Sequence, residues 1–181
     1  MDIDSGVVPA DRRAGYDNAL GRRHVLSCQK RGLKVGKTKS GKGSKVMLLT
    51  DAHGLPLGLQ VHSASPHDVN LIEPLLRGSL RWVMRARRFI YDTAADSRRL
   101  RRRVWLYGPR LIATYRRRRN EQHARRLNSR DQRYYDLRYR IERTFAWLSN
   151  YRRLNIRWEY HAHLFEGFWQ LACLFTILKR L

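Results

Sequence analysis

Apolar and polar residues form their clearest pattern between Lys45 and Ala64. Two β-rich runs, "KVMLLTD" and "LGLQVHSA", are joined by "AHGLP", in which Gly54 and Pro56 are typical turn residues. The pattern predicts a β-hairpin.

A helix is predicted directly after this hairpin. Ser65 is a suitable N-cap, with Pro66 at the first helical position and Asp68 at the third. Four apolar residues then recur at helical spacing and predict one buried face: Val69, Ile72, Leu75 and Leu76.

Shorter elements are predicted in the middle of the chain. The run "RRFIYD" (residues 87–92) indicates a strand that ends on a carboxylate, "DSRRLRRRVW" a basic helix, and "RLIAT" a further strand. The arginines that follow, which include Arg116 and Arg117, predict a solvated linker or a phosphate-facing segment.

The last third of the chain is predicted to be helical. Residues 132–150 carry an apolar stripe, and residues 163–181 are apolar nearly all round, which predicts a buried helix. Residues 1–44 are expected to form an irregular segment with a candidate first strand and a Gly/Lys-rich loop, and residues 45–181 the main domain. The order of elements predicts an α/β fold, with a mixed sheet flanked by helices.

The net charge is +23, from 38 Lys and Arg residues against 15 Asp and Glu, and 31 of the basic residues are arginines. Such a charge attracts polyanions, and forked guanidinium groups suit phosphate oxygens. An effect on solubility alone is a poor explanation of this excess. Nucleic acid is therefore the expected partner.

Several classes of protein are disfavoured. Two cysteines, Cys28 and Cys173, lie too far apart for a cysteine-rich zinc site and fit a reduced compartment. No leader pattern opens the chain, and the apolar run "FWQLACLFTIL" is too short to cross a bilayer. We expect a cytoplasmic protein associated with a bacterial nucleoid.

The stretch "GKTKSGKGSK" resembles a nucleotide-binding phosphate loop but lacks the hydroxyl residue after its Gly-Lys pair. A strand-like run follows it, where a phosphate loop needs a helix. The alternatives are a merely solvated loop and a loop that contacts the DNA backbone. For the second we name four lysines as contact candidates: Lys37, Lys39, Lys42 and Lys45.

Two carboxylates occupy structured positions in this basic chain. Asp92 ends a predicted strand, where ligand sites gather in α/β folds, and Glu142 lies beside the apolar stripe of a predicted helix. Simpler roles exist: Asp92 as a turn or N-cap residue, and Glu142 as the ion-pair partner of Arg138. Brought together, such carboxylates would bind Mg²⁺ for phosphodiester cleavage.

Three segments carry a resemblance to a known family. They are "GLKVGKTKSGKGSKVMLLTDAHGLPLGLQVHSASPHD", "IYDTAADS" and "RIERTFAWLSNYRRL", with the C-terminal "GFWQLACLFTILKRL". They resemble the transposases of IS5-type bacterial insertion sequences, within the DDE group. Tyr135, Arg138 and Glu142 reproduce the Y-x2-R-x3-E part of the signature helix, while Ser149 occupies its later Lys position.

The resemblance implies an RNase H-like domain that cleaves DNA at insertion-sequence ends and transfers the strand, using Mg²⁺ or Mn²⁺. It implies that Asp92 is the second catalytic and metal-binding Asp and that Glu142 is the catalytic Glu. It places Arg138 beside the DNA. It also implies self-association on DNA, since transposases of this kind generally act as multimers.

The first catalytic and metal-binding Asp is assigned to Asp4, because "DIDSGVVPADRRAG" resembles the family context of that residue. Alignment backward from "QKRGLKVGKTK" instead places the position near Arg22, where there is no carboxylate. Asp17 is a third candidate, and Asp51 is expected to be a turn residue.

Two main hypotheses follow. The first is an active DDE transposase that uses Asp4, Asp92 and Glu142. The second is a catalytically inactive remnant, a truncated or downstream-frame copy that only binds DNA, because the helical end-binding region of the family is not found before the first strand. A basic RNA-binding protein is a third and weaker alternative.

Overall fold

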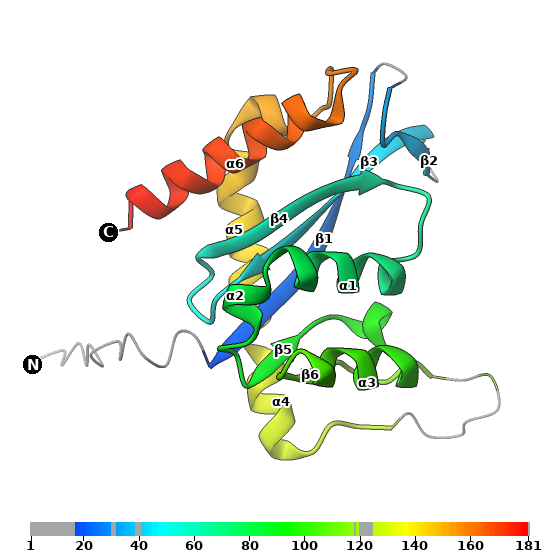
Figure 1. The fold of residues 1–181 in the computed structure, drawn as a ribbon, viewed down its shortest axis with the longest axis vertical. Helices are drawn as coiled ribbons and strands as arrows, with labels where there is room; N and C mark the ends of the chain where they lie inside the picture. Colours follow the sequence, from blue (N-terminus) through cyan, green and yellow to red (C-terminus); the bar gives the residue numbers. More distant parts are fainter. Residues whose placement is uncertain (1–16, 30–31, 39–40, 118, 120–124, 181) are drawn as a thin grey trace, which may run out of the picture.

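The computed structural model describes residues 17–29, 32–38, 41–117, 119 and 125–180 (Figure 1). Its strands are β1 (Asn18–Ser27), β2 (Gly36–Thr38), β3 (Gly41–Thr50), β4 (Pro56–Ser63), β5 (Arg88–Ile90) and β6 (Arg110–Ile112). Its helices are α1 (Asp68–Gly78), α2 (Leu80–Val83), α3 (Arg98–Leu106), α4 (Ser129–Asp136), α5 (Tyr139–Ser149) and α6 (Ala162–Leu178). Short 3₁₀ turns span Thr93–Ala95 and Arg152–Leu154.

Within the described residues the strands form one mixed sheet of six strands, in the order β2-β3-β1-β5-β6, with β4 also paired to β3. β1 runs antiparallel to β3 and parallel to β5, and β5 runs parallel to β6. The expected mixed α/β sheet is thus confirmed, and β1 lies near its centre.

Helices cover both faces of the sheet (Figure 1). Strand residues alternate between the faces. Met47 and Leu49 pack with α1 and α3 on one face, while Val46 and Leu48 pack with α5 and α6 on the other. The result is three layers, with an apolar core on each side of the sheet.

The predicted hairpin is confirmed as β3 and β4, which pair in antiparallel register. At its turn, Oδ1 of Asp51 accepts hydrogen bonds from the backbone N–H groups of His53 and Leu55, at 2.9 and 2.8 Å. Gly54 has a φ of 88°, a conformation that side chains with a Cβ rarely adopt. Asp51 is therefore the turn residue that the sequence indicated.

The helix starts are partly as predicted. α3 lies within the run predicted to be a basic helix and begins at Arg98, with Ser97 as its N-cap accepting a hydrogen bond from the N–H of Leu100. α1 begins two residues later than expected, because His67, and not Ser65, caps it through Nδ1.

One long helix was expected over residues 132–150, and two shorter helices are found. The backbone tightens at Leu137 and Arg138, where N–H groups bond to carbonyls three residues back. α4 ends there and α5 begins, although no proline or glycine marks the junction.

The expectation of an irregular segment up to residue 44 needs correction. β1, β2 and the start of β3 lie within it and belong to the same sheet as the later strands. The candidate first strand near Asp4 lies outside the described residues.

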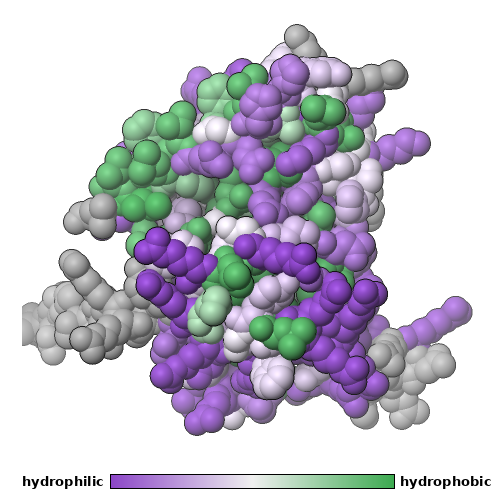
Figure 2. Space-filling view, viewed as in Figure 1, coloured by the Kyte–Doolittle hydropathy of each residue, from purple (hydrophilic) through white to green (hydrophobic). Residues whose placement is uncertain are grey.

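α6 was expected to be buried all round, and this is wrong. Phe165 and Trp169 are buried against the sheet, whereas Leu171, Leu174 and Phe175 are about half exposed. Figure 2 shows hydrophobic residues gathered where α6 crosses this view. The helix therefore has one packed face and one apolar face open to solvent.

None of the described helices is both long enough and apolar enough to cross a membrane.

Candidate active site

Asp92 lies directly after β5, in extended backbone. Its Oδ1 accepts a hydrogen bond of 2.8 Å from the N–H of Ala94 and so caps the short 3₁₀ turn. The simpler role considered for Asp92 is therefore present. It uses one carboxylate oxygen and leaves the other available for a ligand.

The parallel pairing of β1 with β5 ends at Leu20 and Ile90. Two residues further on, the chain reaches Arg22 in β1 and Asp92 just after β5, so both lie at the same end of this pairing. Leu20 and Ile90 both belong to the core on the α5 side. Because side chains alternate along a strand, Arg22 and Asp92 are directed to that same side.

Glu142 approaches from α5, in the first turn of the helix. Its Oε1 forms an ion pair with Nη1 of Arg22, and a second with Nη2 of Arg138 at 3.2 Å. The pairing with Arg138 was expected, and the pairing with Arg22 was not. One strand end and one helix thus bring Asp92, Glu142 and two guanidinium groups to one place.

The β3–β4 turn holds α5 in position. Oγ1 of Thr144 donates a hydrogen bond of 2.6 Å to the carbonyl of Gly54, and Nη1 of Arg140 donates one of 2.6 Å to the carbonyl of Ala52. A Cβ at Gly54 would lie 2.8 Å from Oγ1 of Thr144. The glycine therefore permits the close contact that sets the height of Glu142 above the sheet.

Charges in this region alter neighbouring titrations. Burial, and next the charge of Arg22, lowers the pKa of His24, whose ring stacks on Phe145 at 5.4 Å. Burial raises the pKa of Tyr91, and the carboxylates of Asp68 and Asp92 add to that rise. Burial is the largest cause of both shifts, and nearby charged groups contribute to each.

The candidates for a first catalytic Asp have different positions. Asp4 lies outside the described residues. Asp17 precedes β1 and pairs with Arg87 at 3.6 Å, and the five residues from Asp17 to Arg22 span about 16 Å of extended chain. Asp17 is therefore at the opposite end of the strand from Asp92.

The predicted DNA contacts also separate into groups. Lys37 and Lys42 are exposed on the β2–β3 ribbon, and Arg116 and Arg117 are exposed after β6. Arg138 lies at the site, and Lys39 lies outside the described residues.

Lys45 is not on that surface. It is 3 % exposed, and its Nζ donates to the carbonyl of Pro66 at 2.6 Å and to Oδ1 of Asp68 at 2.7 Å. Because its ammonium group is fully engaged inside the protein, we leave Lys45 out of the proposed contact set.

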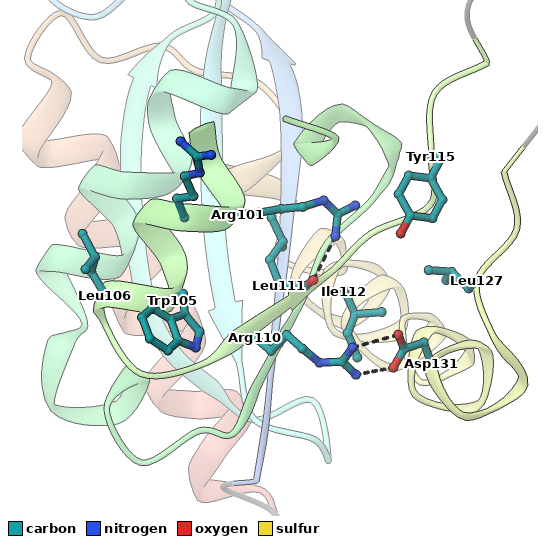
Figure 3. A pocket seen from close by; sticks show the side chains of 10 residues that line it. Arg101, Trp105, Leu106, Arg110, Leu111, Ile112, Tyr115, Leu127 and Asp131 are labelled. Carbon is teal, nitrogen blue, oxygen red and sulfur yellow. Dashed lines mark hydrogen bonds and ion pairs between the residues drawn. The ribbon is translucent and has the colours of Figure 1, made fainter. Parts of the chain in front are cut away.

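A cavity of about 510 Å³ lies elsewhere, between α3, β6 and α4 (Figure 3). Trp105 and Tyr115 line it, together with an ion pair between Arg110 and Asp131. Neither Asp92 nor Glu142 lines it. The cavity is thus separate from the carboxylate site, which lies where β5 ends beside the middle of β1.

Arg157 has a role that the sequence gave no reason to expect. It is 1 % exposed, and its guanidinium donates to Oγ of Ser44 at 2.6 Å and to the carbonyls of Leu33, Lys34 and Tyr160. These hydrogen bonds connect the segment before β2 and the segment before α6 to the first half of β3. An arginine in a chain with 31 of them carries no signal of such burial.

The role of Arg22 had one signal, the backward alignment that placed a carboxylate position near it.

Comparisons with known proteins agree with this architecture. The structure of the piggyBac transposase synaptic complex with hairpin DNA superposes with a TM-score of 0.55 at 12 % identity, covering 87 % of this chain and 45 % of that one. That likeness shows an RNase H-like fold of the kind found in DDE enzymes. The class that the fold defines is therefore the RNase H-like one, a mixed sheet flanked by helices.

The chain belongs to the family of the transposase DDE domain, whose model matches residues 1–177. It is 32 % identical over 174 residues to a protein described as the transposase for insertion sequence element IS402 of Burkholderia cepacia. That match covers 89 % of this chain and 78 % of the relative. The chain spans less than half of the piggyBac protein to which it is structurally similar.

Such enzymes raise the question of a divalent metal. Among the described residues there is no group of three or more His, Cys, Asp and Glu side chains that could hold one. Asp92 and Glu142 supply carboxylates, but the third position carries the guanidinium of Arg22. Metal ions prefer oxygen ligands of this kind and are repelled by a cation, so the described residues do not fit a metal pair.

Proposed function

We propose that this chain acts on DNA as an insertion-sequence transposase of the IS5 type, and that it binds the DNA backbone where β5 ends beside the middle of β1. The observation that carries this is the combination of a transposase fold with a net charge of +23. Phosphate contacts by Lys and Arg side chains supply most sequence-independent affinity for DNA.

The proposed contact surface joins two parts of the sheet. Arg138 lies at the carboxylate site, while Lys37 and Lys42 lie on the β2–β3 ribbon beyond the end of β1. In the β1–β3 register, Arg22 faces Leu48 and Ser27 faces Gly43, so the two parts are about 16 Å apart. A stretch of duplex backbone can contact both.

Duplex binding tests this proposal. Fluorescence anisotropy of a labelled DNA duplex should show tight binding that weakens steeply with salt and depends little on sequence. Charge reversal at Lys37 and Lys42 together should weaken it at constant stability. Binding that ignores both salt and this double variant would rule the proposal out.

Cleavage and strand transfer is the second candidate function, and the placement of Asp92 and Glu142 favours it. In the described residues the metal set is incomplete, so the sequence-based candidate Asp4 would have to supply the third carboxylate. Nicking of supercoiled plasmid in Mg²⁺ or Mn²⁺ tests it. Asp4→Asn, Asp92→Asn and Glu142→Gln should each abolish nicking and preserve DNA binding if these three residues form the site.

The remaining parts of the proposal concern the cell. A protein that grips DNA in this way would be found on the nucleoid of a bacterial cytoplasm. Self-association on DNA is also proposed, and sedimentation with and without duplex tests it.

A further inference from the structure

Arg22 occupies a central place in the site and has no role in the reaction that the family resemblance implies. We infer that the guanidinium group of Arg22 takes the place of a metal cation in the carboxylate site, and that this chain binds DNA there without binding a divalent metal. The inference rests on the proposed function for its DNA-binding part, and on the geometry around Arg22 for the rest.

The position of Arg22 is fixed by packing on both faces of β1. Leu20 is fully buried in the core on the α5 side. On the other side, Gly21 lies so close to Phe89 that a Cβ would come within 2.6 Å of its ring. A shift of the strand by one residue would turn every side chain to the opposite face, so Arg22 cannot leave the site by a change of register.

The charges at the site are already balanced. Arg22 and Arg138 both pair with Glu142, and Arg22 and Asp92 each lie two residues beyond the last pair of the β1–β5 register. Two guanidinium groups thus accompany two carboxylates. A divalent cation entering this arrangement would meet two positive groups at close range, whereas a carboxylate at position 22 would attract it.

Asp17, Asp51 and Asp68 do not replace the missing ligand. Asp17 lies at the far end of β1, and Asp51 is engaged in its own turn. Asp68 lies on the opposite face of the sheet, where it pairs with Arg23 and Lys45. The site therefore has a guanidinium group, from Arg22, where a third carboxylate ligand would be needed.

Arg22 can nevertheless serve DNA binding. Its side chain is 34 % exposed and that of Arg138 is 30 % exposed, so both can be reached from solvent, although Nη1 of Arg22, which faces Glu142, is itself buried. A DNA phosphate can accept from these guanidinium groups directly, without a bridging metal. We therefore expect duplex binding by the wild-type chain to be unchanged by EDTA.

The test measures Mn²⁺ binding to the full chain by electron paramagnetic resonance and by calorimetry. Wild type should show no saturable site up to about 1 mM Mn²⁺, a concentration at which carboxylate sites in proteins fill. Arg22→Asp should gain a saturable Mn²⁺ site, with an affinity for Mn²⁺ at least an order of magnitude higher than that of wild type. Arg22→Gln, which removes the charge without adding a ligand, should not reproduce that gain.

A double variant and the wild type itself keep the test decisive. Asp92→Asn should remove the site that Arg22→Asp gains. If Arg22→Asp folds by circular dichroism and gains no Mn²⁺ site, the inference is overturned. If it does not fold, wild type decides alone, because a saturable Mn²⁺ site that disappears on Asp92→Asn would also overturn it.

Duplex binding is measured on the same samples. If the wild-type chain does not bind the duplex, the proposed function is overturned, and the Mn²⁺ result is judged separately. Tight binding in EDTA, with no Mn²⁺ site, supports both.

Discussion

Lys42 and Lys45 lie three positions apart on β3, yet they have opposite surroundings. Lys42 is exposed, whereas Lys45 is buried against Asp68. Their chemistry is identical, so position alone separates a phosphate contact from a structural ion pair.

We predict that Lys42→Ala weakens binding to all duplex sequences and lowers the log–log salt slope by about one, because one phosphate contact is lost. Its free energy of unfolding should change by less than about 0.5 kcal/mol. Lys45→Ala should lower that free energy by about 3 kcal/mol, because Asp68 loses a buried partner. Urea unfolding and anisotropy on both variants check this, and equal effects of the two on stability would contradict it.

Asp51 gives a prediction for pH. Burial raises the pKa of Asp51 despite the hydrogen bonds that it accepts. The folded state therefore keeps its proton to higher pH than the unfolded state does. The stability gained in this way is complete below the ordinary pKa of an aspartate and is lost as pH rises through the raised value.

Asp51→Asn should remove this loss, because the amide oxygen accepts the same two backbone hydrogen bonds without a charge. The variant should be at least as stable as wild type at pH 7 and should be less sensitive to pH between about 4 and 7. Urea unfolding at both pH values measures this, with the half-exposed Asp17→Asn as control. A large loss of stability at pH 7 would show that the charge itself is needed.

At the scale of elements, the sequence predicted those whose turn or capping residues lie within the element itself. It did not predict the pairing of strands far apart in the chain. The hairpin and α3 carry their own turn and capping residues, so short segments sufficed to predict them. β1 was missed because "GRRH" interrupts its alternation. Those polar residues lie there because that part of the strand forms the site, which only the pairing with β5 reveals.

Part of the candidate site could be predicted from the sequence. Asp92 and Glu142 follow from a strand end and a helix motif, and the structure brings each to the region of Arg22. The assignment of Asp4 stays a prediction. The ion pair of Arg22 with Glu142 joins residues more than a hundred positions apart, and no local pattern encodes it.

α6 shows how the two faces of one helix differ. Phe165 is fully buried beside Arg157, whereas Phe175 is 49 % exposed. Phe165→Ala should lower the free energy of unfolding by about 3–5 kcal/mol, because it leaves a cavity in the core. Phe175→Ala should cost less than about 1 kcal/mol. Urea unfolding distinguishes them, and similar losses would mean that the outer face of α6 is covered in solution.

At the scale of the whole molecule, charge governs behaviour. The excess of +23 should make affinity for duplex DNA fall by at least about a hundredfold between about 50 and 200 mM salt, because each phosphate contact releases counterions. Anisotropy titrations over this range measure the slope. A flat response would point to base contacts or to stacking as the main source of affinity.

The central place of β1 also has a consequence for how the chain folds. β1 meets β3 after a connection that contains β2, but it meets β5 only when Asn18 pairs with Arg88, seventy residues later. Parallel pairing at such separation is slow, because a long loop must close before any contact repays the cost. During synthesis the hairpin would therefore form first, leaving one edge of β1 open until β5 emerges. The carboxylate site would be among the last parts of the protein to assemble.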